Sequence, residues 1–355
     1  MTNRDILAGV ALMSFVKLPA VTKPVQNPLD FAIVVGIDHY TQGILPLNGA
    51  INDCDLFCRW LMDPGMGGLD SENITYLRSV ANNSEPIRSQ VEDRLTLFFE
   101  QADSSGNPCG RRLYLFFAGH GLVPPPPDTS GCALVMADAR ATLLRGLLGF
   151  RAADAMRMTG LFHEVMLVMD CCAEVSGQSE LACFLPRYGD PTLAARPFTH
   201  IQAAQWGAST AERMLDDPFD SSAPRLWQGV LTNALLRGLT TAADASGVVT
   251  AASLKQFLEA TEVGGPKIEH SNGAANDVMS FGAAVGLTVD IALSGTATRF
   301  QIREGNNFSV VIPPRAVAPV RLAPGQYLFD ALDPQGTVTR SVPVSVREGG
   351  THVQL

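Results

Sequence analysis

The chain has few basic residues, no long apolar run and no regular cysteine spacing, and each shortage excludes a class of protein. It holds 26 lysines and arginines against 35 aspartates and glutamates, for a formal net charge of -9 at pH 7. Proteins that bind nucleic acid usually carry a basic face, so this balance argues against that class. No apolar run approaches the ~20 residues that a membrane-spanning helix needs. We therefore expect neither nucleic-acid binding nor a membrane span.

The seven cysteines show no framework spacing, and their number is odd. A secreted domain stapled by disulfides is usually short, with an even number of cysteines. The apolar run at residues 6–16 does not fit a signal peptide, because Asp5 precedes it, Ser14 interrupts it and no small-residue cleavage site follows. We therefore expect reduced thiols, a cytoplasmic location and an amphipathic N-terminal helix.

Apolar residues make up 46% of the chain, which is enough for a packed core. A length of 355 residues suggests about two domains of roughly 150 residues each. Buried strands are predicted at 31–37, 74–77, 113–117, 132–136, 164–169 and 200–206, and helices at 47–62, 84–101, 150–159, 227–239 and 250–260. Strands that alternate with helices favour an α/β fold with a parallel sheet and helices on both faces.

The pattern changes at about residue 286, where short strand-like runs are separated by turn residues and no helix fits between them. Such a pattern is typical of a small all-β sandwich. The predicted division is an N-terminal segment at 1–29, an α/β domain at 30–285 and a β-rich module at 286–355. The module has no cluster of catalytic residues, so we expect it to dock a partner protein.

Two of the buried strands end in residues that carry chemistry. The strand at 113–117 is followed by Ala118-Gly-His-Gly121, and the strand at 164–169 by Asp170-Cys-Cys172. The carboxyl ends of parallel strands share one edge of a sheet, where ligands bind. An imidazole beside a thiol is the minimum equipment for covalent acyl transfer, because the imidazole takes the proton and the thiolate attacks a carbonyl. Neighbouring strand residues point to opposite faces, so one of Cys171 and Cys172 should face the cleft and the other the core.

Several motifs follow one another in a fixed order. They are Phe31-Ala-Ile-Val-Val-Gly-Ile37, Leu47-Asn-Gly-Ala-Ile-Asn-Asp53, Phe117-Ala-Gly-His-Gly121, Asp170-Cys-Cys172, Ala208-Ser-Thr-Ala-Glu212 and Gly229-Val-Leu-Thr-Asn-Ala-Leu-Leu236. His120 also precedes Cys172 by about 50 residues, the separation known from caspases. In these features residues 30–261 resemble the caspase-like cysteine peptidases, and within them the metacaspase and prokaryotic caspase-like branch. The resemblance implies a large part at 30–177, a linker at 178–197 and a small part at 198–285.

The resemblance also implies roles for individual residues. Cys172 would be the nucleophile and His120 the general base and acid, with the backbone N–H groups of Gly121 and Cys172 as the oxyanion hole. Asp53 and Asp170 match the acids of a primary pocket that accepts Arg or Lys. Asp138 is a possible third acid of that pocket, although a capping role in a loop explains it equally well.

The linker carries Arg187 and Arg196, and we hypothesise that the enzyme cuts itself after one of them. No cofactor is predicted. Some metacaspases bind calcium through an aspartate cluster, but Asp216, Asp217 and Asp220 are equally well explained as a solvated acidic loop. The segment after the nucleophile also departs from the family, because Ala173-Glu-Val-Ser-Gly177 stands where His-Ser-Gly is usual.

The sequence thus predicts a cysteine endopeptidase that cleaves protein substrates after Arg or Lys, and by analogy one that acts in regulated bacterial cell death or defence. One alternative is a catalytically silent scaffold whose β module binds partners. The full set of His120, Cys172, Asp53 and Asp170 argues against it, because a scaffold does not need these residues together. Another alternative is a non-proteolytic acyl hydrolase, which would need a roomy apolar cleft.

Overall fold

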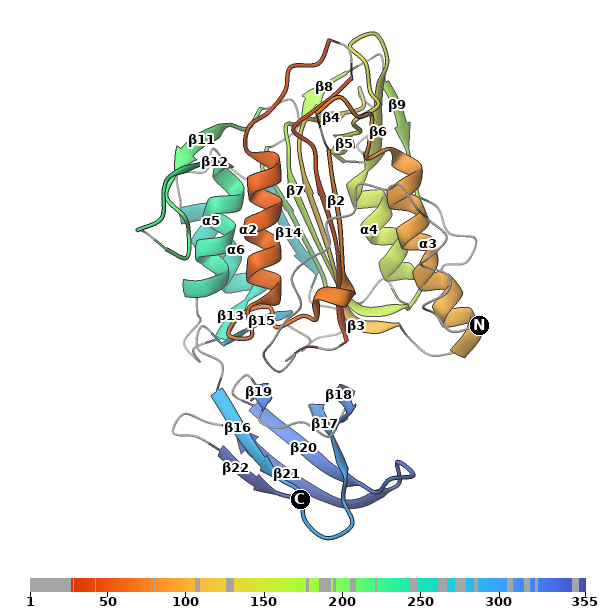
Figure 1. Cartoon of the computed structure of the whole chain (residues 1–355), viewed down its shortest axis with the longest axis vertical. Helices are drawn as coiled ribbons and strands as arrows, with labels where there is room; N and C mark the ends of the chain where they lie inside the picture. The colour runs from red at the N-terminus through yellow and green to blue at the C-terminus, as the bar shows by residue number, and fades with distance from the viewer. Residues whose placement is uncertain are drawn as a thin grey trace.

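A six-stranded sheet is the centre of the fold in the computed structural model (Figure 1). The strand order is β14-β10-β7-β3-β1-β2, all parallel except β14, which is antiparallel to β10. Their bounds are β1 (Asp30–Gly36), β2 (Ile74–Arg78), β3 (Gly110–Ala118), β7 (Phe162–Asp170), β10 (Phe198–Gln202) and β14 (Lys267–Ser271). The structure describes residues 27, 29–41, 43–79, 81–105, 109–125, 131–176, 179–184, 193, 196–204, 209–220, 222–242, 248–260, 267–271, 279–283, 287–304, 309–315, 320–322, 325–346 and 351–355.

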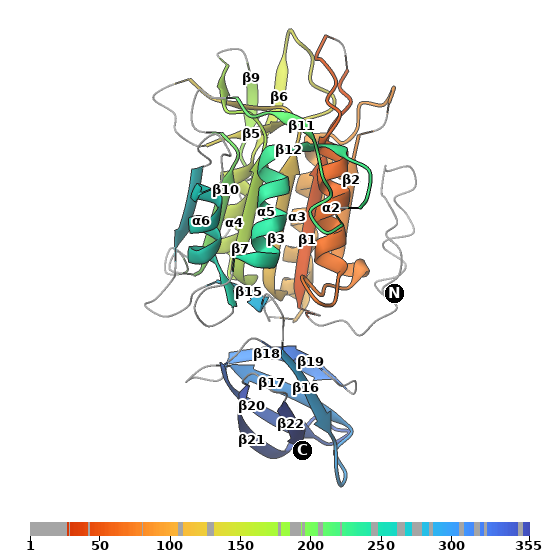
Figure 2. The same ribbon diagram turned by 90° about the vertical axis from the view of Figure 1, so that its left-hand side faces the viewer.

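Helices cover both faces of this sheet, as the alternation of strands and helices predicts (Figure 2). One face packs against α2 (Ala50–Met62), α5 (Val230–Thr241) and α6 (Ala251–Ala260), and the other against α3 (Arg88–Ser105) and α4 (Gly149–Met158). Side chains of β1 alternate between the two cores, because Ala32 and Val34 lie in the first, and Ile33 and Val35 in the second. The sheet is therefore buried on both faces, which explains its continuous apolar runs.

A second, five-stranded sheet lies beyond the carboxyl ends of the central strands (Figure 1). Its order is β8-β4-β5-β6-β9, with β4 (Gly121–Val123), β5 (Ala133–Val135), β6 (Leu144–Leu148), β8 (Glu174–Val175) and β9 (Ser179–Ala182). Only residues 176–178 separate β8 from β9, although these strands form opposite edges of the sheet. The sheet must therefore curl until its two edges come close together.

Shorter elements complete the α/β domain. They are the 3-10 turn η1 (Ser71–Asn73), the antiparallel hairpin of β11 (Glu212–Leu215) and β12 (Leu226–Gly229), and the pair of β13 (Val248–Thr250) and β15 (Ser280–Ala283). Within the part of the chain that the structure describes, no helix is long and apolar enough to cross a membrane.

The C-terminal strands form two separate sheets, at the end of the molecule opposite the second sheet (Figures 1 and 2). One contains β19 (Val320–Leu322), β16 (Leu287–Ala292) and β22 (Thr351–Gln354); the other contains β18 (Ser309–Arg315), β17 (Arg299–Glu304), β20 (Gly325–Leu332) and β21 (Val338–Val346). Val289 and Val353 of the first sheet share one apolar core with Phe300 and Phe329 of the second. This arrangement agrees with the predicted sandwich-like module.

Two predictions about local structure are wrong or incomplete. The helix predicted from Trp227 begins at Val230, because residues 226–229 pair with β11. The predicted linker 178–197 contains β9, which pairs with β6. The expected N-terminal helix at 6–16 lies outside the described residues.

Candidate active site

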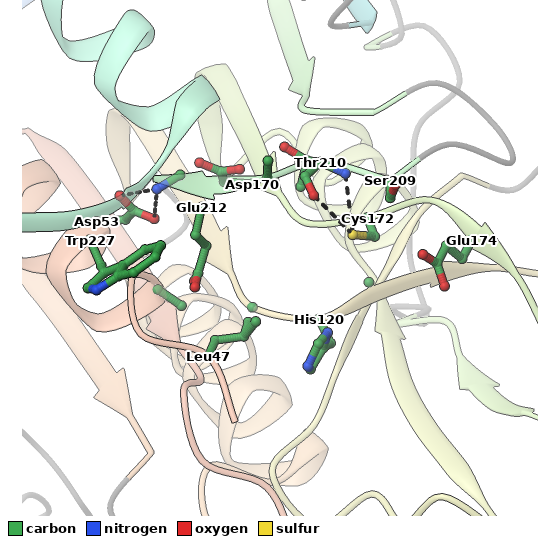
Figure 3. Close-up of a pocket in the computed structure, with 15 residues that line it drawn as sticks. Leu47, Asp53, His120, Asp170, Cys172, Glu174, Ser209, Thr210, Glu212 and Trp227 are labelled. Carbon is green, nitrogen blue, oxygen red and sulfur yellow. Dashed lines mark hydrogen bonds between the residues drawn. The ribbon is translucent and has the colours of Figure 1, made fainter. Parts of the chain in front are cut away.

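The fold brings His120 and Cys172 to the same edge of the central sheet. His120 follows β3 and Cys172 follows β7, and these neighbouring strands are in parallel register, with Ala118 opposite Asp170. Both side chains line a cavity of about 390 Å³ (Figure 3). The sequence prediction that these residues meet at the carboxyl edge is confirmed.

The imidazole of His120 is held from one side. The ring Nε2 lies 2.8 Å from the carbonyl oxygen of Leu45. The backbone N–H of His120 donates to the Tyr40 hydroxyl oxygen at 2.7 Å. A carbonyl oxygen only accepts, so this contact places the proton of the neutral ring on Nε2. Nδ1 is then the nitrogen that accepts a proton. The hydrogen bonds of the described residues do not join the ring to Cys172.

The two adjacent cysteines have different surroundings. Cys171 is fully buried in the core, and its Sγ lies 3.4 Å from the Sγ of Cys132. The contact with Cys132, and after it burial, raises the pKa of the Cys171 thiol well above its ordinary value. Cys172 is partly exposed and lines the cavity. The predicted division, with one thiol toward the core and one toward the cleft, is confirmed.

The Cys172 thiol has a pKa above its ordinary value. Burial is the largest cause, and the negative charge of Glu174 adds to it. The backbone N–H of Thr210 points at Sγ from 3.4 Å and opposes the increase. The resting group is therefore a thiol, which needs a base to become a nucleophile.

The backbone of Gly121 lies directly against Cys172. A Cβ at this position would collide with the carbonyl oxygen of Cys172, so only glycine fits. The N–H of Val135 in β5 donates to the carbonyl oxygen of His120 at 2.9 Å. Because successive residues of an antiparallel strand bond in alternate directions, the N–H of Gly121 points away from β5 and toward the side of β8. That direction suits a donor to an oxyanion formed at Cys172.

Two buried aspartates lie on one side of Cys172. Asp53 is 2% exposed, and both of its carboxylate oxygens accept from the Gly229 N–H, at 2.9 and 3.0 Å. Asp170 accepts from the N–H and the hydroxyl of Thr232, at 2.9 and 2.5 Å. Gly229 separates the two acids so closely that a Cβ there would strike the Asp170 carboxylate. The structure thus brings together the two aspartates named from the sequence.

These aspartates are held in an unfavourable charge environment. Burial raises the pKa of Asp170 to about 6, although the hydrogen bonds from Thr232 oppose the increase. Burial, and after it the charge of Asp170, raises the pKa of Asp53 well above its ordinary value. Two carboxylates this close cannot both ionise without cost unless a cation comes between them.

Glu212 is a third acid of the cavity that the sequence analysis did not assign. Its carboxylate accepts from the backbone N–H groups of Gly49 and Asn48, at 2.9 and 3.0 Å, which fixes it at the start of α2. It pairs with Gly229 across the β11–β12 hairpin, so it faces the same way as that glycine. The available signal was its place in the Ala208-Ser-Thr-Ala-Glu212 motif, after the strand that neighbours β7.

The cavity is acidic as a whole. Within the described residues, its charged lining side chains are all carboxylates: Asp53, Asp170, Glu174 and Glu212. The indole of Trp227 and the side chain of Leu47 form apolar parts of the wall (Figure 3). Such a lining favours a cationic side chain and disfavours an acidic or purely apolar one.

Two described residues that were named from the sequence, Asp138 and Arg196, do not line this cavity. Asp138 pairs with Arg145 at 2.9 Å in a separate depression, so it is not a third pocket acid. Arg196 donates to the carbonyl oxygens of Gly160 and Phe162, before and at the amino end of β7. Phe162 is roughly 26 Å from the carboxyl end of β7, measured along the strand. Arg187 lies outside the described residues.

The aspartates considered for calcium are engaged elsewhere. Asp217 pairs with Arg59 at 2.8 Å, and Asp216 with Arg225 at 3.2 Å. A search of the described residues finds no group of three or more His, Cys, Asp or Glu side chains suited to a metal ion. All seven cysteines are free thiols.

Three comparisons report what this chain is similar to. A family model described as a caspase domain matches residues 29–261, which include both His120 and Cys172. A curated protein of a Desulfuromonadales bacterium, named as a probable protease, is 22% identical over 215 residues, which are 59% of this chain and 26% of that protein. The chain thus spans about a quarter of that relative. A solved structure, caspase-1 from Spodoptera frugiperda, is 13% identical with a TM-score of 0.42, covering 77% of this chain and 98% of that one.

Proposed function

The chain belongs to the caspase-domain family of cysteine peptidases, and from this premise we propose that it is an endopeptidase that cuts proteins after arginine or lysine. One observation carries the proposal: a cysteine and a histidine share a cavity whose other charged groups are all acids. The family match alone gives no specificity. The acids supply the specificity, because a cation relieves the repulsion within a buried carboxylate pair, whereas an acidic side chain would increase it.

The chemistry assigned to His120 and Cys172 is acyl transfer in two steps. Nδ1 of His120 takes the thiol proton, and the thiolate forms a bond to the scissile carbonyl carbon. The resulting oxyanion accepts from the backbone N–H groups of Gly121 and Cys172. His120 then gives its proton to the leaving amine as the C–N bond breaks. A water molecule, deprotonated by His120, cleaves the thioester and restores the thiol.

The primary pocket is assigned to Asp53, Asp170 and Glu212. A guanidinium is planar and can donate hydrogen bonds to two carboxylates at once, so it suits this pocket better than an ammonium does. When the basic side chain of the substrate enters the pocket, the attraction of Asp53 and Asp170 to its positive charge offsets the repulsion between them. Binding of a basic substrate side chain is therefore expected to lower the pKa values of these acids.

Self-processing and the biological role are also proposals. Of the two candidate cleavage sites, the Arg196 side chain is engaged at the far end of β7. Self-cleavage in the linker is therefore assigned to Arg187. We place the enzyme in the cytoplasm, where thiols stay reduced, and in regulated cell death or defence, with the β module as the docking site for a partner.

The decisive experiment is cleavage of short fluorogenic peptides that differ only in the residue before the scissile bond. We expect cleavage after Arg and Lys, and a fall of at least ~1000-fold in Cys172→Ala. Cys183→Ala is the matched control, because Cys183 is an exposed thiol outside the cavity. Cleavage after Asp would refute the acidic pocket. If no peptide is cut by the wild type, the scaffold alternative stands, and the β module should then be tested for partner capture.

A further inference from the structure

We propose that Glu174 selects substrates with a basic residue directly after the scissile bond, so that the preferred target is a pair of consecutive basic residues. This inference rests on the proposed function, and it names the substrate class of the same site. Glu174 is distinct from the acids of the primary pocket in its position and in its partners.

The position of Glu174 is fixed by β8. The residue comes two places after Cys172 and pairs with Leu122 of β4, the strand that begins with Gly121. Its carboxylate lines the same cavity as Cys172. Figure 3 shows it on the opposite side of Cys172 from Asp53, Asp170 and Glu212. The acids of the cavity therefore fall into two groups, with the nucleophile between them.

This division corresponds to the two sides of the scissile bond. The side chain before the bond enters the pocket of Asp53 and Asp170, so the acyl carbon lies at Cys172. The leaving amine then extends to the other side, past His120, which must reach it to donate a proton. The first residue of the leaving peptide thus lies beside Glu174, and a carboxylate there favours a lysine or arginine side chain.

Glu174 lacks the partners that structural acids of this segment have. Among the described residues, no hydrogen bond or ion pair joins its carboxylate to another group. Glu180, six positions later on β9, is within 3.6 Å of Arg88 and 3.4 Å of Arg145. Both glutamates are exposed, so exposure alone does not explain the difference.

An unpartnered acid beside the nucleophile has a chemical cost. The charge of Glu174 contributes to the raised pKa of the Cys172 thiol, which works against thiolate formation. A cation on the substrate cancels that charge while it binds. The same substrate residue therefore improves binding and eases deprotonation, and an enzyme acting on neutral leaving peptides would gain nothing from this glutamate.

The test uses internally quenched peptides that share an arginine before the bond and differ only after it, with lysine, glutamine or glutamate. For the wild type we expect kcat/KM to fall about fivefold at each step in that order, the size of a partly exposed charge pair. Glu174→Gln should make the three rates nearly equal, and Glu174→Lys should reverse their order. Glu180→Gln is the matched control and should keep the wild-type order.

A second readout follows the thiol itself. The rate of Cys172 alkylation by iodoacetamide, measured against pH in the absence of substrate, reports its deprotonation. We expect the midpoint to move to lower pH in Glu174→Gln and to stay in place in Glu180→Gln, because His120 and Asp170 are unchanged in both variants. A purely structural role for Glu174 would leave this midpoint unchanged.

Failure of the inference is distinguishable from failure of the proposed function. Equal wild-type cleavage of the three peptides would overturn the role of Glu174 and leave cleavage after arginine intact. If none of the peptides is cut, the proposed function fails and the substrate preference fails with it.

Discussion

The acidic side chains at the two ends of the central sheet differ in their partners: those at one end pair with arginine, and those at the other end do not. At the amino end, Asp30 receives two contacts from Arg111, at 2.5 and 2.8 Å, and Glu164 receives two from Arg112, at 2.5 and 2.7 Å. At the carboxyl end, Asp53, Asp170 and Glu212 accept from backbone and hydroxyl donors, and no arginine or lysine among the described residues pairs with them. The same sheet therefore neutralises its charges where they are structural and leaves them unneutralised where a ligand is expected.

The pKa values express this difference. Burial acts to lower the pKa of the Arg112 guanidinium, but the charge of Glu164 raises it above its ordinary value, so the guanidinium stays charged. The charges near Asp53 and Asp170 have the same sign, so each adds to the effect of burial. A buried acid with a raised pKa in a cleft is a functional candidate, whereas a buried acid with an arginine partner is not.

Removal of a partner at the amino end should give the largest loss of stability. Arg112→Met leaves Glu164 without its cation and the Tyr114 hydroxyl without its donor. We expect the free energy of unfolding to fall by about 3 kcal/mol or more, measured by urea denaturation. Arg225→Met is the control, because its pair with Asp216 is exposed on both sides and should cost about 1 kcal/mol at most. Equal losses would break the comparison.

Removal of an acid at the carboxyl end should have the opposite sign. The pKa of Asp170 is about 6 in the folded protein against an ordinary 3.8. Protonation of Asp170 therefore favours the folded state fully below about pH 4, and this contribution to stability is lost as the pH rises through 6. Above pH 7 the ionised group costs roughly 3 kcal/mol. Asp170→Asn should therefore be more stable than the wild type at pH 8, with a gain that disappears near pH 4.

The same variant should lose activity toward arginine peptides by about 100-fold, because one charge of the primary pocket is gone. Asp138→Asn is the matched control and should keep full activity, since Asp138 lies outside the cavity. A variant of Asp170 that is less stable at pH 8, yet fully active, would show that this acid belongs to the structural class.

The smallest effect is expected at Glu212, which is partly exposed and already bound to backbone donors. Glu212→Gln keeps one acceptor oxygen and removes the charge. We expect KM for arginine peptides to rise about fivefold with little change in kcat, as for a partly exposed charge pair. A fall in kcat at constant KM would instead show that Glu212 acts in the reaction step and not only in substrate binding.

The parts of the site that follow long buried strands were predictable from sequence. β3 and β7 are continuous apolar runs, and parallel strands in a buried sheet must end at a common edge. That placed His120, Cys172 and Asp170 together, and alternation along the strand separated Cys171 from Cys172. The change of texture near residue 286 likewise indicated the sandwich, because its strands are short and separated by turns.

The remaining parts of the site depend on the pairing of short strands, which leaves no periodic pattern of apolar residues in the sequence. Strands β4, β5, β8 and β9 are two to four residues long, too short for an alternating pattern to be visible. Glu212 and Trp227 face the cavity because β11 and β12 pair, and the sequence at 227 resembles the start of a helix. Asp138 follows a predicted strand, but that strand belongs to the second sheet, so its end points to a different place.

The proximity of β7 and β10 has a consequence for a chain cut anywhere between Ala182 and Phe198. The two fragments would still share a parallel ladder, Phe198 to Gln202 against Val165 to Met169, and a common core in which Leu235 and Ile201 pack with Phe57 and Val168. No covalent bond is needed to keep these contacts. After such a cut, a denaturing gel would show two bands where a sizing column shows one peak, and the fragment that carries the nucleophile would not leave without the fragment that carries Glu212.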